Sequence, residues 1–164
     1  MNSSRCPVPK DQQPTNEFIE LSNSRIFSWA KSKRKFSIIL IFSWLITFIL
    51  FLLISSGSVY FLTNLLKYTF LSFFSSLSLP LLITIRLYLG WNHIYKRLRA
   101  ETIEYEESGW YDGQIWIKPI ELKEKECLIA SKEVKPILTN LTQTTSVLIA
   151  LILIGTLILQ YSNI

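Results

Sequence analysis

The side chains that could do chemistry are few in this chain. His93 is its single histidine, and Cys6 and Cys127 are its only cysteines. One His and two Cys cannot close a four-ligand zinc site without carboxylates or a second chain. A lone imidazole could ligate haem or a metal, but a bis-His haem site needs a second histidine. An ordinary histidine near a membrane surface is the favoured interpretation of His93.

The remaining candidates for chemistry are the acidic residues between positions 104 and 112. Paired carboxylates can do acid–base work or bind a hard cation. No nucleophile–base pair and no ligand spacing accompany them, so we favour a solvated strand edge, or ion pairs with Lys96, Arg97 and Arg99. The carboxylates concerned are Glu104, Glu106, Glu107 and Asp112. The weak metal-site candidates are then His93, Cys6, Cys127, Glu106 and Glu107.

No catalytic or cofactor-binding residue is predicted. The chain has no Walker loop, dinucleotide fingerprint, HExxH or GxSxG motif. We therefore expect a protein that is not an enzyme and that requires no cofactor.

The composition points to a membrane. The chain has 164 residues, of which 49% are hydrophobic and 18% charged, with a net charge of +5. This length is too short for two packed soluble domains. So few charges on so apolar a chain exclude disorder.

Three stretches could cross a bilayer, which predicts a mainly α membrane protein. Residues 36–54 carry no charge over 19 positions and would form a helix of about 28 Å, against a hydrocarbon core of about 30 Å. Residues 68–89 form the second span, with small serines that permit close helix approach and a kink expected at Pro80. Residues 136–161 form the third, with Pro136 in its first turn. Arg86 is expected to be an anchor near the end of the second span, with an intramembrane functional cation as the alternative.

The distribution of lysine and arginine predicts the orientation. Seven precede the first span, one lies between the first and second, eight lie between the second and third, and none follows. Cytoplasm-like faces hold the excess of positive charge. The N-terminal arm (1–35, with an interfacial helix) and the region 90–135 are therefore expected on one side. Both cysteines would then lie in a reducing compartment, where a stable disulfide does not persist.

The region 90–135 is expected to hold a helix extension, a β-hairpin and a short helix over 121–133, whereas 55–67 is a short loop. Alternation over 102–118 predicts the hairpin, with Ile103 and Tyr105 on one side of its first strand and Ile115 and Ile117 on one side of its second. An isolated hairpin is marginal in water, so this one must pack on the membrane surface, the N-terminal arm or a partner. A nucleic-acid surface is not expected, because the basic run 31–35 touches the bilayer.

Three motifs resemble a known family. They are Cys6-Pro-Val-Pro9, then Leu87-Tyr-Leu-Gly-Trp91, and above all the stretch YEESGWYDGQ that ends at Gln114. The sequence resembles the hypothetical chloroplast open reading frame 36 family, over about residues 6–141. The resemblance implies a multi-pass plastid membrane protein of unknown activity, in the thylakoid or inner envelope, with its N-terminus in the stroma. Some relatives are linked to iron-deficiency responses.

We therefore expect a non-enzymatic protein for assembly, maintenance or regulation of a plastid membrane complex, whose partners are the bilayer and other plastid membrane proteins. The alternatives are a metal- or iron-linked membrane factor and a small transporter subunit. Aromatic, glycine and proline residues are the expected docking surface: Cys6, Pro7, Pro9, Trp91, Tyr105, Trp110, Tyr111, Asp112, Gly113 and Trp116.

Overall fold

The computed structural model describes residues 7–58, 64–106 and 113–161. The chain divides into two compact units. The first, which we call the head unit, combines Met1–Ser28 with Leu89–Thr139, and the second, the helical unit, combines Trp29–Tyr88 with Asn140–Ile164.

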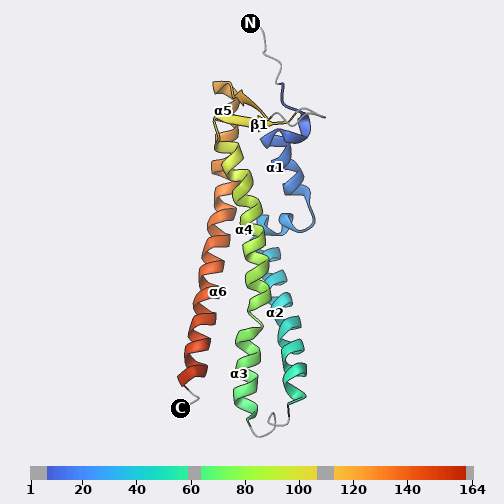
Figure 1. Ribbon diagram of the computed structural model, residues 1–164, viewed down its shortest axis with the longest axis vertical. Helices are drawn as coiled ribbons and strands as arrows, with labels where there is room; N and C mark the ends of the chain where they lie inside the picture. Colours follow the sequence, from blue (N-terminus) through green and yellow to red (C-terminus); the bar gives the residue numbers. More distant parts are fainter. Residues whose placement is uncertain (1–6, 59–63, 107–112, 162–164) are drawn as a thin grey trace. The chain divides into compact units, whose positions relative to one another are not determined.

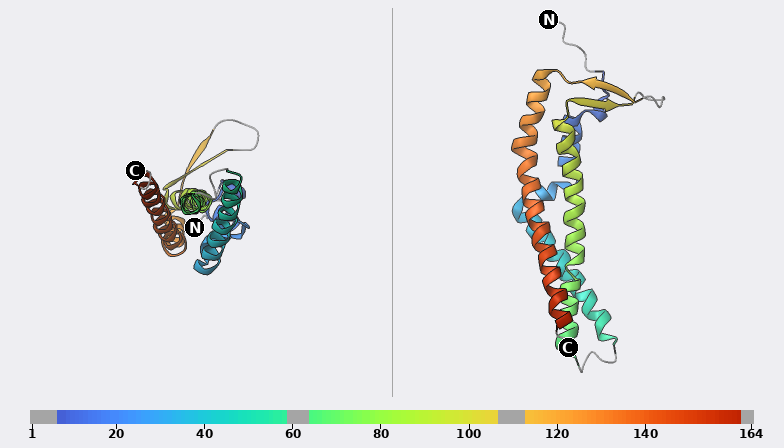
Figure 2. Two further views of the ribbon diagram at one scale, coloured as in Figure 1. Left: turned by 90° about the horizontal axis from the view of Figure 1, so that it is seen from below. Right: turned by 60° about the vertical axis from the view of Figure 1, so that its left-hand side comes forward.

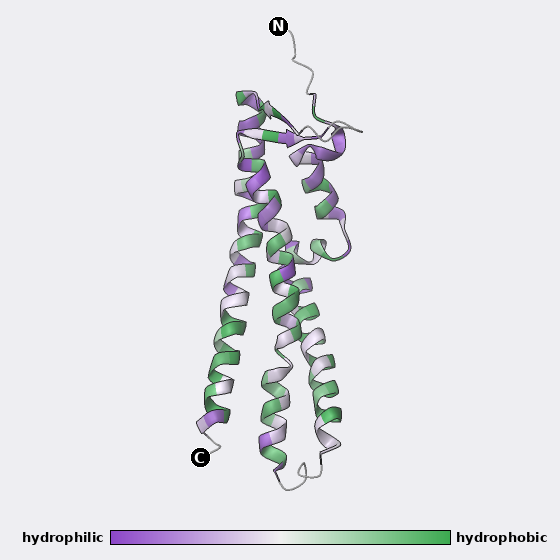
Figure 3. Ribbon diagram, viewed as in Figure 1, coloured by the Kyte–Doolittle hydropathy of each residue, from purple (hydrophilic) through white to green (hydrophobic). Residues whose placement is uncertain are grey.

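The helical unit is built from long apolar helices (Figure 1). Its elements are α2 (Lys33–Ser56), α3 (Leu65–Ser75), the first half of α4 (Ser78–Arg99) and most of α6 (Lys135–Tyr161). A short 3-10 helix, η2 (Phe27–Lys31), leads into α2. The helix predicted over 36–54 is confirmed and is a few residues longer at each end. Hydrophobic side chains dominate α2 and the C-terminal half of α6 (Figure 3).

Three helical stretches are long and apolar enough to cross a membrane. They are Lys33–Ser56, Leu65–Arg99 and Ile120–Tyr161. Few side chains are buried in the first and third stretches, where 6% and 11% of the most apolar window is buried, against 33% in Leu65–Arg99. A helix with apolar residues on every side needs an apolar surrounding, which a bilayer supplies.

The kink expected from Pro80 is a break at Ser76 and Leu77, between α3 and α4, in the turn before the proline. Proline lacks an N–H and its ring crowds the carbonyl four residues earlier, which here belongs to Ser76. The hydroxyl of Thr47 on α2 lies 2.9 Å from that carbonyl and can donate to it, sharing its single proton with the carbonyls of Ser43 and Trp44 on its own helix, at 2.9 and 3.0 Å. The break therefore falls one turn before the proline.

Serines and aromatic rings make contacts between the helices of the helical unit. Ser72 and Ser76 are buried, and the hydroxyls of Ser55 and Ser72 lie 3.0 Å apart, so two of the serines expected to allow close approach do so. Trp44 stacks on Phe48, with ring centroids 5.4 Å apart, and meets Phe73 edge-on at 5.2 Å. These contacts join α2 to α3.

The head unit contains all the β-structure that the structure describes. Its elements are η1 (Lys10–Gln12), α1 (Pro14–Asn23), the second half of α4, β1 (Thr102–Tyr105), β2 (Gln114–Ile117), α5 (Ile120–Ile129) and the π-helical turn η3 (Ala130–Val134). The predicted hairpin is confirmed as an antiparallel pair (Figure 2). The helix extension predicted after residue 89 is also confirmed, since α4 continues to Arg99.

The inner face of the sheet is covered by the N-terminal arm. Val8 forms a buried cluster with Ile103 and Tyr105, against which Trp116 packs. Of the three supports considered for the hairpin, the arm is the one observed. Ile115 and Ile117 share one side of the second strand, as predicted, but that side is not the one that packs on the arm, because Ile103 pairs with Trp116 and residues opposite each other share a face. Ile115 and Ile117 therefore point outward.

The helix expected to end near residue 133 does not end there. α5 runs through η3 into α6, so that 120–161 is continuous. Pro136 is the second residue of α6 and follows the π-helical turn directly. The wider π turn relieves the crowding that Pro136 imposes on the carbonyl four residues earlier, that of Lys132. The third apolar stretch thus begins as a charged helix in the head unit.

Candidate functional site

A buried ion pair lies in the head unit. The ammonium group of Lys118, after β2, lies 2.5 Å from a carboxylate oxygen of Glu126 on α5, and the two side chains are 0% and 2% exposed. The other Glu126 oxygen accepts a hydrogen bond from Thr15 of α1 at 3.0 Å. Lys118 also donates to the carbonyl of Arg97 at 2.9 Å. Since unpaired carbonyls end a helix, Lys118 also caps α4.

This pair connects the arm, α4, β2 and α5. Every formal charge in it is compensated, and the carboxylate has donors at both oxygens. A buried pair of this kind fixes a geometry and adds little net stability, because desolvation offsets the attraction. Its role is to position the elements of the head unit.

A second polar group ties the arm to the hairpin. The guanidinium of Arg97 pairs with the carboxylate of Glu17 and also donates to the carbonyl of Gln12 at 3.0 Å. The side chain of Gln12 exchanges two hydrogen bonds with the backbone of Glu106, at 2.9 and 3.0 Å. Among the described residues Arg97 thus pairs with the arm and not with Glu104 or Glu106, whereas the other two hairpin carboxylates, Glu107 and Asp112, lie outside the described residues. Arg99 instead donates to the hydroxyl of Tyr95 at 3.0 Å.

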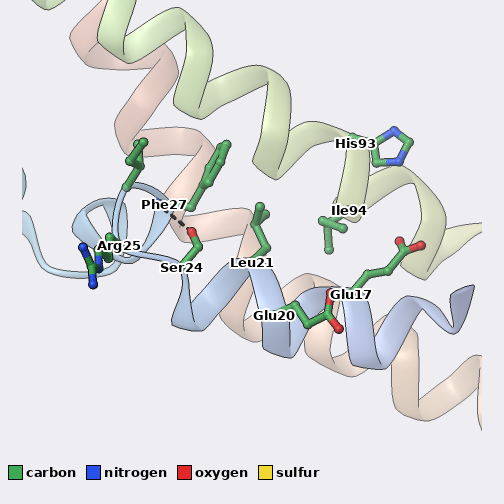
Figure 4. Close-up of a pocket in the computed structure, with 9 residues that line it drawn as sticks. Glu17, Glu20, Leu21, Ser24, Arg25, Phe27, His93 and Ile94 are labelled. Atoms are coloured by element: carbon green, nitrogen blue, oxygen red, sulfur yellow. Dashed lines mark hydrogen bonds between the residues drawn. The ribbon is translucent and has the colours of Figure 1, made fainter. Parts of the chain in front are cut away.

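A groove of 530 Å³ runs along α1 and the segment that follows it, facing α4 (Figure 4). Apolar side chains form its walls and polar groups lie toward its ends. Its lining residues are Glu17, Glu20, Leu21, Ser24, Arg25, Ile26, Phe27, His93 and Ile94. A concave apolar surface with a few polar groups is the usual form of a small-molecule site.

Glu17 is the most perturbed group in this groove. One of its carboxylate oxygens, Oε2, is buried and has no hydrogen-bond partner among the described residues. Burial raises the pKa of Glu17, the charges of Arg97 and His93 oppose this rise, and the charge of Glu20 adds to it. A half-desolvated carboxylate with an unpaired oxygen can accept a hydrogen bond or attract a cation.

Comparison with known proteins decides the family. Residues 6–147 match the family described as CGLD27-like, conserved in the green lineage and diatoms 27. The chain belongs to this family. The resemblance carried by the YEESGWYDGQ stretch is thus confirmed, and no solved structure matches the chain.

Similar proteins are known from plastids. The uncharacterized protein ycf36 of Pyropia yezoensis is 42% identical over 152 residues, which cover 89% of each chain. The uncharacterized protein ycf36 of Cyanophora paradoxa is 40% identical over 94% of this chain and 98% of its own. A chloroplastic protein of Arabidopsis thaliana, named conserved in the green lineage and diatoms 27, is 39% identical over 87% of this chain and 44% of its own. These names support a plastid location for an uncharacterised family.

The metal candidates of this family member lie in several places. His93 is exposed on α4, where it lines both the groove and a second hollow of 440 Å³. Cys127 is a half-buried free thiol on α5, and Glu106 follows β1. Cys6 and Glu107 lie outside the described residues. Within 7–58, 64–106 and 113–161, no three His, Cys, Asp or Glu side chains form a group that could hold a metal ion.

The docking candidates divide into buried and exposed residues. Trp91 and Tyr105 are buried and support the head unit from within, and Trp116 is half-buried. Pro7 and Gly113 are exposed, and Pro9 is half-buried. The other candidates, Cys6, Trp110, Tyr111 and Asp112, lie outside the described residues.

Sequence reasoning missed the buried pair and the groove. Lys118 and Glu126 stand among many charged residues of similar spacing, so no local pattern distinguishes them. The groove depends on Leu21 and Phe27, which lie more than sixty residues from His93 along the chain. Only the long-range packing of α1 on α4 brings these side chains together.

Proposed function

We propose that this chain is a non-enzymatic membrane protein of the plastid that supports assembly, maintenance or regulation of a membrane complex by docking one of its proteins. Three apolar helical stretches support the membrane part of this proposal. The alternating lysine and arginine counts support an arrangement with the N-terminus and the head unit on the stromal side. The plastid names of the relatives support the organelle.

The observation that carries the docking proposal is a set of three exposed isoleucines, which we call the isoleucine face. Ile115, Ile117 and Ile120 are 67%, 74% and 76% exposed. The arm already covers the opposite face of the sheet, so the isoleucine face is free of that contact. Exposed apolar side chains gathered in a soluble region mark interaction sites.

The chemistry around the isoleucine face indicates what binds there. In the strand register, Ile115 lies opposite Glu104 and Ile117 lies opposite Thr102. Since opposite residues share a face, an exposed carboxylate borders the isoleucines. We therefore propose a protein partner with an apolar patch bordered by Lys or Arg, which would complement both features.

Photo-crosslinking in plastids tests this proposal. A photoreactive amino acid placed at position 117 is expected to yield a specific adduct with a membrane-complex protein, identified by mass spectrometry. The same amino acid at position 124, an exposed site on α5, provides the control. Equal adducts from both positions, or none from 117, would reject docking at this face.

A matched pair of variants separates docking from folding. Ile115→Ser with Ile117→Ser is expected to abolish co-purification of the crosslinked protein while the chain still accumulates in the membrane. Leu128→Ser changes another exposed apolar residue of the head unit, 56% exposed on α5, and is expected to leave co-purification intact. Loss of the partner in both variants would argue against the isoleucine face.

A further inference from the structure

The two edges of the sheet differ in what covers them. Each strand of a two-stranded sheet bonds to its neighbour on one side only, so its other side presents backbone N–H and C=O groups. The N–H of Lys118 donates to the carbonyl of Glu101 at 3.0 Å, and the backbone groups of successive residues point to opposite sides of a strand. Trp116 therefore bonds toward β1, whereas the N–H and C=O groups of Ile115 and Ile117 point away from it.

The outer edge of β1 is covered by other parts of the head unit. By the same alternation, Glu106, which follows β1, turns its N–H and C=O away from β2. The side-chain amide of Gln12 bonds to both groups, at 2.9 and 3.0 Å, where a neighbouring strand would bond. Further along this edge, Thr102 and Ile103 line the hollow of 440 Å³ together with Pro14 of α1 and residues of α4. The arm and α4 thus flank the outer edge of β1.

The outer edge of β2 has no such cover. Within the part of the chain that the structure describes, no group outside the sheet bonds to the backbone of Ile115 or Ile117. Their side chains are 67% and 74% exposed. Pro119, which lacks an N–H, follows soon after the strand and keeps this edge short. Free N–H and C=O groups at the spacing of a strand are complementary to the backbone of another extended chain.

We propose that β2 is a strand-addition site, where an extended segment of the partner protein binds as a third strand. The backbone of that segment exchanges hydrogen bonds with Ile115 and Ile117, at the usual distance of about 4.8 Å between strands. Its side chains on the isoleucine face are apolar or β-branched, because they lie directly beside two isoleucines. Strand addition rests on the docking proposed at the isoleucine face and adds how the partner is held there.

A second copy of the chain fits this edge less well than a different protein. Two β2 strands paired about a twofold axis at Trp116 would place Ile115 opposite Ile117 of the second copy. Since opposite residues share a face, the two isoleucine faces would join into one larger apolar patch that stays uncovered. A different protein can add a strand and cover the isoleucine face with the rest of its structure.

Hydrogen exchange of single backbone amides, in the full chain in detergent, tests the edge directly. In the free chain, the amides of Ile115 and Ile117 are expected to exchange at least about tenfold faster than that of Trp116, which bonds within the sheet. In the complex with the crosslinked protein, both should slow about tenfold or more, while Trp116 changes little. Slow exchange at 115 and 117 in the free chain would mean that this edge is already occupied. Fast exchange at both in the complex would mean that the partner adds no strand. Either result would overturn the proposal, and the second would leave docking on the isoleucine face in place.

A matched pair of substitutions separates strand addition from docking on the face alone. Ile115→Pro removes the outward N–H and places its ring on the open edge, where sheets accept proline. Ile115→Val has the same number of side-chain carbons as the proline and keeps the N–H. Ile115→Pro is expected to lower recovery of the crosslinked protein about tenfold, because a carbonyl of the added strand is left unpaired. Ile115→Val is expected to recover it like wild type.

The possible outcomes distinguish the two proposals. Equal recovery by Ile115→Pro and Ile115→Val would reject strand addition and leave docking on the isoleucine face in place. Recovery of no protein by the wild-type chain would reject both, and recovery of a second copy of this chain would reject a different protein as the occupant. A thermal melt checks that Ile115→Pro still folds, and if it does not, hydrogen exchange of the wild-type chain decides.

Discussion

The two units satisfy their polar groups in opposite ways. In the head unit, charged side chains reach across elements that are far apart in sequence, as Thr15 and Glu126 do over 111 positions. In the helical unit, hydroxyls bond mainly to their own helix, as Thr84 bonds to the carbonyl of Pro80 at 2.8 Å. Hydrogen bonds thus join distant elements in one unit and remain local in the other.

This difference follows from the surroundings that each unit is suited to. A hydroxyl that bonds back to its own helix leaves no donor exposed to hydrocarbon, whatever its neighbours do. A charged pair needs several partners to offset desolvation, and the head unit supplies them from four elements. Removing one hydrogen-bonding side chain should therefore lower the free energy of unfolding by a large amount in the head unit and by a small amount in the helical unit.

The largest effect is expected from breaking the buried ion pair. Glu126→Ala leaves the ammonium of Lys118 buried without its counter-charge, which costs about 3–5 kcal/mol. We expect a large fall in the melting temperature of the purified chain and poor accumulation in the membrane. Thermal unfolding followed by tryptophan fluorescence would measure it.

The double variant Lys118→Met with Glu126→Leu tests the cause. Replacing both charges by apolar side chains of similar size removes the desolvation cost, so much of the lost stability should return. The exposed pair of Lys123 and Glu101, whose charged atoms lie 2.6 Å apart, is the control, and Glu101→Gln should change stability little. A double variant no better than Glu126→Ala would show that the pair's own attraction dominates.

How far the sequence predicts the molecule depends on the range of each interaction. The apolar stretch 36–54 and the hairpin 102–118 were predictable, because composition and alternation are local. The inward position of Trp116 was not, since either face of β2 is apolar and only the pairing with Ile103 chooses between them. The groove and the Lys118–Glu126 pair were also out of reach, because each requires segments that fold together from distant parts of the chain.

Glycines on two helices provide the next comparison. A Cβ at Gly155 of α6 would lie 2.2 Å from both Cγ and Cδ1 of Phe74, whereas at Gly90 it would meet the far end of the Phe27 ring. Overpacking costs about 1–3 kcal/mol, and alanine returns up to about 1 kcal/mol of helix propensity. We expect Gly155→Ala to lower the melting temperature more than Gly90→Ala. The new methyl group would meet Cγ of Phe74, the atom that joins the ring to Cβ, so rotating the ring about its own axis cannot remove the clash.

A second substitution tests this assignment. Phe74→Leu in the Gly155→Ala background removes the ring that the new methyl group meets, so it should recover part of the lost stability. The same Phe74→Leu change in the wild-type background should destabilise by itself. Additive losses in the combined variant would show that the two positions do not touch.

A smaller effect is expected at Thr47, whose hydroxyl also reaches a carbonyl outside its own helix, unlike most hydroxyls of the helical unit. Thr47→Val removes the hydroxyl that donates to the Ser76 carbonyl, at a cost of about 0.6 kcal/mol, which is typical between membrane helices. Among the described residues, the hydroxyl of Thr69 bonds within α3, to the carbonyl of Leu66 at 2.8 Å, so Thr69→Val is the matched control. Pro80→Ala restores the missing N–H and should make Thr47→Val nearly neutral. A Thr47→Val effect of the same size in both backgrounds would contradict the proposed compensation.

The smallest expected effect is a difference in pH dependence between two carboxylates of the head unit. Burial raises the pKa of Glu17 in the folded chain above its ordinary value of 4.5. Between pH 4.5 and this raised pKa, the folded chain therefore holds a proton that the unfolded chain has released. Stability then falls as pH rises through this window. The hydrogen bond from Lys123 instead lowers the pKa of Glu101, and stability from that contact is lost as pH falls below about 4.5.

Melting temperatures between pH 3.5 and 7.5 should show Glu17→Gln gaining on wild type as pH rises and Glu101→Gln falling behind. Parallel curves for the two variants would mean that burial does not distinguish these carboxylates.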